Sequence, residues 1–181
     1  MRGYAHFDHR VSLASCYALV SNPRWVARHS FFPFIGEEVR RTKWRNGKPH
    51  KDPRPIRYAA HLDRAIYQYY TALLNDLYSK KAQAASIDEV SIAYRTNHPG
   101  MSNCNYALKA FSYIRKQEKC WVCVGDFKSF FETLDHVYLK RMMRLLFADG
   151  RIPDDFYRVL KSATKYAVWP IDDLLKRHAF Q

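Results

Sequence analysis

The stretch that decides the fold reads Cys120-Trp-Val-Cys-Val-Gly-Asp126-Phe-Lys-Ser-Phe-Phe131-Glu-Thr-Leu-Asp-His136. An apolar run of strand length ends on a carboxylate, aromatic residues follow, and a helical pattern begins near Leu134. This order predicts a buried strand with Asp126 at its carboxyl end. At that position the side chain can face a metal ion or a phosphate.

Composition limits the class of protein. With 181 residues, the chain suits one medium domain, or one domain and the start of a second. An apolar content of 48% allows a hydrophobic core and excludes a disordered tail. Lys and Arg number 30 against 17 Asp and Glu, a formal charge of +13, which favours a polyanionic partner.

The sequence also indicates a compartment. It contains no apolar span long enough for a transmembrane helix, and its first residues lack the apolar stretch of a signal peptide. Its four cysteines are too few and too scattered for a disulfide framework. We therefore expect a cytoplasmic protein without membrane contact.

Helical patterns outnumber strand patterns, which predicts an α+β fold and no doubly wound sheet. The predicted helices are 13–20, 62–81, a helix capped by Ser102 or Asn103, 134–147, one starting at Ile152-Pro153-Asp154, and one starting near Trp169. In the helix capped by Ser102 or Asn103, we expect Ala107, Ala110, Phe111 and Ile114 to face the core. In the helix that starts at Ile152, we expect Phe156, Val159 and Leu160 to do so. Residues 90–95 are predicted to be a short strand or extended piece.

The most basic segment surrounds a turn signal. Asn46-Gly47 predicts a hairpin, and we interpret the segment as a basic, mobile hairpin or loop. Asp52 is the single acidic residue in it. Its cations are Arg40, Arg41, Lys43, Arg45, Lys48, Lys51, Arg54 and Arg57.

Three blocks, in order, resemble bacterial reverse transcriptases. The stretch from Asp126 to His136 is similar to their first catalytic-aspartate motif, Asp-hydrophobic-x-x-Phe-Phe-x-x-hydrophobic-Asp/Asn-His. Upstream, Arg54-Pro-Ile-Arg-Tyr-Ala-Ala-His-Leu-Asp63 before a Tyr-rich helix resembles the fingers of phage-defence and abortive-infection types, and Ile92-Ala-Tyr-Arg95 resembles the next block. The likeness covers roughly residues 50 to 165.

The resemblance implies an RNA-directed DNA polymerase, a nucleotidyltransferase that uses RNA template, DNA primer and dNTP. Residues 1–118 would be helix-rich fingers, and 119–181 the beginning of a right-hand palm, incomplete. In the complete enzyme two Mg²⁺ (or Mn²⁺) ions drive transfer, with the Asp126 carboxylate and the Phe127 carbonyl as ligands. Phe131 would pack against the 2′ position of the sugar and favour deoxynucleotides.

The family also implies phosphate contacts from cations. Arg95 and Arg54 are assigned to the incoming nucleotide. The nucleic-acid backbone is assigned to Arg40, Arg41, Lys43, Arg45, Lys48, Lys51 and Arg57.

The chain departs from the family pattern in lacking the Tyr-x-Asp-Asp hairpin, the block before it and the thumb. One carboxylate cannot hold two ions, so we expect no polymerisation by this chain alone; a second chain carrying the rest of palm and thumb is a candidate partner. Asp154-Asp155 and Asp172-Asp173 are interpreted as acids at helix N-termini. Cys120-x-x-Cys123 is not favoured as a metal or redox site, because residues three apart on a strand face opposite sides.

Two alternatives remain open. One is a non-catalytic nucleic-acid-binding module, or a remnant of a reverse transcriptase, that keeps the basic surface of the fingers. The other is a protein–protein module for a toxin or defence partner. The host element (retron, intron or antiviral defence system) is also open, and the Arg-Pro-Ile-x-Tyr-x-x-His run favours a defence type.

Overall fold

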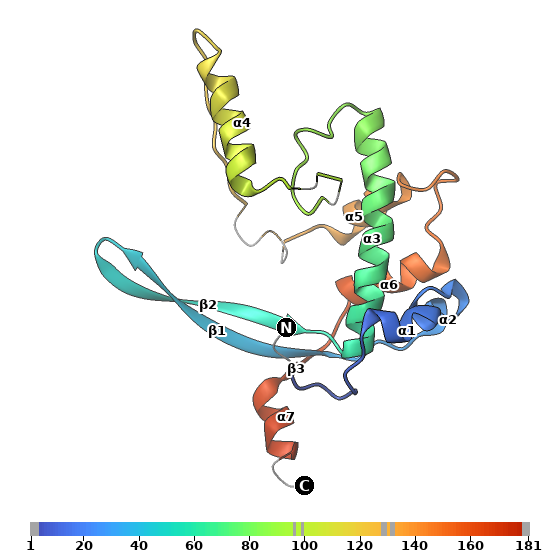
Figure 1. Cartoon of the computed structure of the whole chain (residues 1–181). Coiled ribbons are helices and arrows are strands. Elements are labelled where there is room, and N and C mark those ends of the chain that lie inside the picture. The colour runs from blue at the N-terminus through green and yellow to red at the C-terminus, as the bar shows by residue number, and fades with distance from the viewer. Residues whose placement is uncertain (1–3, 96, 99, 128–129, 131–132, 179–181) are drawn as a thin grey trace. The chain divides into compact units, whose positions relative to one another are not determined.

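The computed structural model describes residues 4–95, 97–98, 100–127, 130 and 133–178; the side chains at positions 41, 43, 45, 50, 52, 177 and 178 lie outside this description. The architecture is α+β, as predicted, with helices and one small sheet (Figure 1). The chain forms two compact units: Met1–Ala72 with Ile152–Gln181, and Leu73–Arg151. This division into two units leaves the predicted boundary between fingers and palm at residue 118 untested. No helix among the described residues is long and apolar enough to cross a membrane.

The sheet of the first unit has the strand order β2-β1-β3. β1 (Phe34–Arg45) pairs antiparallel with β2 (Lys48–Tyr58), and β3 (Val168–Pro170) lies parallel to the first residues of β1. Between β1 and β2, Asn46 and Gly47 have φ values of 51° and 73°, the left-handed conformations that a two-residue hairpin turn requires. The predicted hairpin is confirmed, and it forms a long two-stranded ribbon (Figure 1).

The prolines of β2 all lie where no sheet hydrogen bond is lost. The Phe34 N–H donates to the Ala167 carbonyl, which precedes β3. The backbone N–H and C=O groups of the even-numbered residues of β1 therefore point away from β2. Given the register from Ile35↔Tyr58 to Arg45↔Lys48, the backbone groups of the odd-numbered residues of β2 point away from β1. Three of those outward positions are occupied by Pro49, Pro53 and Pro55. β2 is therefore an edge strand by sequence as well as by position.

Helices of the first unit enclose a small core. They are α1 (Leu13–Val20), α2 (Pro23–Arg28), the beginning of α3 (His61–Ala84), α6 (Asp154–Thr164) and α7 (Ile171–His178). The helices predicted at α1, α3, α6 and α7 are confirmed, whereas α2 was not predicted. Tyr70 and Phe156 are buried and meet edge to face, with ring centroids 4.8 Å apart. The Tyr70 hydroxyl donates a hydrogen bond of 2.7 Å to buried Asp155. As predicted, Phe156 and Val159 are buried, whereas Leu160 is half-buried. The Asp154-Asp155 and Asp172-Asp173 pairs lie in first helical turns, also as predicted.

The start of α3 is capped from a distant part of the chain. Asp8 accepts hydrogen bonds from the backbone amides of His61 and Leu62, both at 3.0 Å, and from the His61 ring at 2.9 Å. Burial acts to raise the pKa of Asp8, but these hydrogen bonds outweigh it and lower the pKa below its ordinary value. The Tyr4 hydroxyl donates to Ala59 at 2.7 Å. The N-terminal segment thereby fixes the junction between β2 and α3.

The second unit contains the end of α3, α4 (Asn103–Arg115) and α5 (His136–Arg144). Ser102 caps α4 in a reciprocal pair with Asn105, as the sequence predicts. The expected core stripe on α4 is wrong, because no residue of this helix is buried and the Phe111 side chain is 64% exposed. The helix makes no extensive contact with another described helix or strand, and the loop around Glu89 beside it leaves most of its apolar side chains exposed.

Candidate functional site

The segment before Asp126 is not the buried strand that the sequence predicts. Residues 121–127 have no regular secondary structure, and Trp121, Val124 and Phe127 are 103, 92 and 80% exposed. A strand needs a neighbour for its backbone hydrogen bonds. No described residue of this unit lies in a strand, so the apolar run is left unpaired and Asp126 is exposed.

The metal assignment stays a prediction. Asp126 and Phe127 lie on this exposed segment, and Phe131 lies outside the described residues. Within the described part of the chain, no three His, Cys, Asp or Glu side chains gather as a metal site would require. Cys120 and Cys123 are exposed, unbridged thiols.

Arg95 lies in the second unit, in a loop with turns, where the sequence predicted a short strand or extended piece. Tyr94 has a φ of 56°, which interrupts an extended backbone at that point. The Arg95 side chain is almost buried, forms an ion pair with Asp88, and donates to the Ser79 hydroxyl at 3.2 Å. Its guanidinium also lies over the Tyr78 ring, 4.9 Å from the centroid.

The partner of Arg95 is held in its charged form. Burial acts to raise the pKa of Asp88, but hydrogen bonds from Asn97 and Arg95 and the nearby positive charge outweigh it and lower the pKa. A phosphate that approaches Arg95 would have to replace this carboxylate. The assignment of Arg95 to a nucleotide phosphate therefore stays a prediction that requires exchange of its ion pair.

The hairpin brings the predicted basic residues together on one ribbon. Its register places Arg40, Lys51 and Arg57 on one face, and Lys48 and Arg54 on the other. All five are exposed. The side chains of Arg41, Lys43 and Arg45 lie outside the described atoms, although their backbone pairs with β2.

Sequence reasoning missed an aromatic residue on this ribbon. Trp44 shares the face of Arg40 and Lys51, and its side chain is 72% exposed. An exposed indole beside cations can stack on a nucleic-acid base. Strict alternation along β1 would have placed Trp44 on that face once the hairpin turn was accepted.

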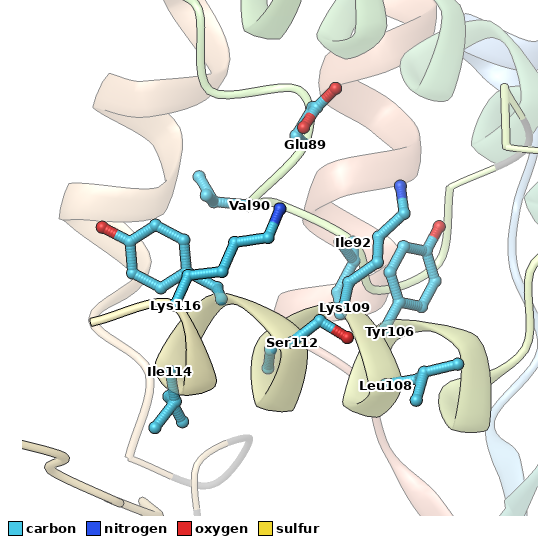
Figure 2. A pocket seen from close by; sticks show the side chains of 11 residues that line it. Glu89, Val90, Ile92, Tyr106, Leu108, Lys109, Ser112, Ile114 and Lys116 are labelled. Carbon is cyan, nitrogen blue, oxygen red and sulfur yellow. The ribbon is translucent and has the colours of Figure 1, made fainter. Parts of the chain in front are cut away.

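A second feature that the sequence did not indicate is an open groove in the second unit. The groove has a volume of about 770 Å³ and lies between the loop around Glu89 and α4. In Figure 2, Lys109 of α4 and Lys116, the residue after the helix, extend toward that loop, where Val90 and Ile92 lie. The groove is therefore apolar with cationic side chains beside it.

Comparison with known proteins does not assign the chain to a family. No family model matches it, and no curated protein matches it.

Proposed function

We propose that this chain is the N-terminal part of an RNA-directed DNA polymerase, and that its β1–β2 hairpin binds the nucleic-acid backbone. The observation that carries the proposal is the composition of one hairpin face, where Arg40, Lys51 and Arg57 accompany the exposed Trp44. Cations bind phosphates of any sequence, and an indole stacks on any base. Such a face suits template or primer contact that must not depend on sequence.

The polymerase part of the proposal rests on the motif from Asp126 to His136. In the family, the run before this aspartate lies in a palm sheet between neighbouring strands. The exposed apolar run at 121–127 is consistent with a strand that requires such neighbours. Under this proposal Asp126 and the Phe127 carbonyl bind the metal ions, while Phe131 contacts the sugar.

The second candidate is a nucleic-acid-binding module without catalysis. The unpaired, exposed state of the Asp126 segment favours it, because binding through the hairpin does not require that segment. Both candidates share the hairpin as their binding surface. They differ in what Asp126 does.

The test of the shared part is the salt dependence of single-stranded RNA binding. We expect Arg40→Gln/Lys51→Gln to weaken binding and to reduce the slope of log K against log salt by about 1.4, since each phosphate contact contributes about 0.7 on a single strand. Lys80→Gln/Lys81→Gln removes the same charge from exposed positions of α3 and should leave the slope unchanged. Equal slopes in both variants would refute hairpin binding.

Asp126→Asn separates the two candidates. Supplied with a second chain that carries the later palm motifs and thumb, the native protein should extend a DNA primer on RNA in the presence of Mg²⁺. The variant should bind RNA as the native protein does but extend no primer. Extension at the native rate by the variant would remove Asp126 from the catalytic centre, and absence of extension by the native pair would favour the binding module.

A further inference from the structure

A pocket lined by cations and aromatic rings lies within the first unit, apart from the hairpin faces. Its volume is about 400 Å³, within the range of roughly 300–1,000 Å³ typical of small-ligand pockets. Its walls come from residues 31–33, from the C-terminal half of α6 and from the residues that lead into β3. We call it the α6 pocket.

One wall of the α6 pocket is cationic. Arg158 and Lys161 are three residues apart on α6 and so lie on the same side of the helix, and Lys165, the residue after the helix, lines the same pocket. The Arg158 Nε donates a hydrogen bond of 2.7 Å to the His29 carbonyl, which holds the guanidinium in place. No Asp or Glu is among the described residues that line the pocket. An anion is therefore the complementary ligand.

Aromatic rings also line the pocket, and other rings pack against them. Phe32 stacks on Phe7 with ring centroids 6.3 Å apart, and Tyr166 meets Phe34 edge to face at 5.0 Å. Phe32 and Tyr166 nevertheless keep 45 and 51% of their surface exposed. Rings that are both held and accessible offer flat surfaces on which a planar group can stack.

We propose that the α6 pocket binds one nucleotide unit, with its base against the Phe32 and Tyr166 rings and its phosphate against Lys161 and Lys165. Cations near a helix C-terminus are favourable even without a ligand, so the lysines alone would not carry this proposal. Their combination with accessible, supported rings does, because a nucleotide is both anionic and planar. The site goes beyond the proposed function, since it is separate from the hairpin and requires no polymerisation.

The test is calorimetric titration of the native protein with adenosine 5′-monophosphate, adenosine and inorganic phosphate. We expect the monophosphate to bind at least ten-fold more tightly than adenosine or phosphate alone. Lys161→Gln/Lys165→Gln should weaken that binding at least ten-fold, while the charge-matched Lys80→Gln/Lys81→Gln should leave it within two-fold. Lys165→Gln changes a residue beyond the end of α6, so it should also weaken monophosphate binding without altering the helix.

The source of the nucleotide is distinguished by a five-nucleotide RNA. If the nucleotide unit belongs to an RNA strand, the RNA binds more tightly than the monophosphate. The α6 variants, Lys161→Gln/Lys165→Gln and Lys165→Gln, then weaken RNA binding even in protein that also carries Arg40→Gln/Lys51→Gln. If it is a free nucleotide, only the monophosphate responds to the α6 variants. The proposal is overturned if the native protein does not bind the monophosphate, if phosphate alone binds as tightly, or if the α6 and control variants lose affinity equally. The hairpin variant should not change monophosphate binding, so failure of this site and failure of the proposed function give different results.

Discussion

The cap on α3 gives the sharpest prediction about stability. Asp8→Ala removes an acceptor from the backbone amides of His61 and Leu62 and from the His61 ring. Loss of a side-chain cap costs about 0.5–2 kcal/mol, and a buried donor left without a partner costs about 1–3 kcal/mol. Because the His61 side chain is almost buried, we expect a loss of about 2–4 kcal/mol in the free energy of unfolding.

The matched control is Asp135→Ala. Asp135 caps α5 by accepting from Val137 and Tyr138 at 2.8 and 3.1 Å, but this helix start is exposed to water. Water can replace those bonds, so we expect a loss of only about 0.5–1 kcal/mol. Denaturant titration followed by far-UV circular dichroism measures both variants, and equal losses would refute the claim that the N-terminal segment is docked on α3.

The pH dependence of the Asp8→Ala effect adds a check. The pKa of Asp8 is lower in the folded protein, so its contribution to stability is present above its unfolded pKa of about 3.9 and is lost as pH falls through the folded value. The difference in stability between native protein and Asp8→Ala should therefore stay constant near neutral pH and narrow below about pH 4. A difference that instead widens in acid would contradict this assignment.

Three other predictions concern the first unit. Tyr70→Phe leaves buried Asp155 without the hydroxyl that donates to it, and should lower the unfolding free energy by about 1–3 kcal/mol by denaturant titration. Gly36→Ala places a methyl group 2.5 Å from Val168, so it should lower the melting temperature, whereas Gly47→Asn, at a turn position open to solvent, should change it little. Burial lowers the pKa of His6, so stability should fall as pH drops below about 6.5, the ordinary histidine value, and His6→Phe should remove that part of the fall.

Local signals explain why most helices and the hairpin could be predicted. Asn46-Gly47 allows left-handed φ values at both turn positions, and the Ser102 side chain accepts from the Asn105 amide in the first turn of α4. Such features depend on residues a few positions apart. The sequence shows them without knowledge of the rest of the chain.

Non-local features could not be predicted in the same way. The apolar run before Asp126 has strand composition, but a strand also needs a paired neighbour, and composition does not report whether one is present. Asp8 caps α3 from 53 residues away, and nothing in the sequence around Asp8 indicates that contact. The α6 pocket likewise joins Phe32 to Lys165, which only the packed first unit brings together.

The prolines of β2 bear on whether molecules of this protein associate through their ribbons. A strand that adds to the outer edge of β2 would find outward amide donors only at Lys51 and Arg57, because the other three positions are prolines. Cross-β stacking requires an unbroken row of such donors. The ribbon can therefore remain long, exposed and basic without fibril growth along this edge, and Pro53→Thr/Pro55→Thr should make the protein self-associate at concentrations where the native chain does not.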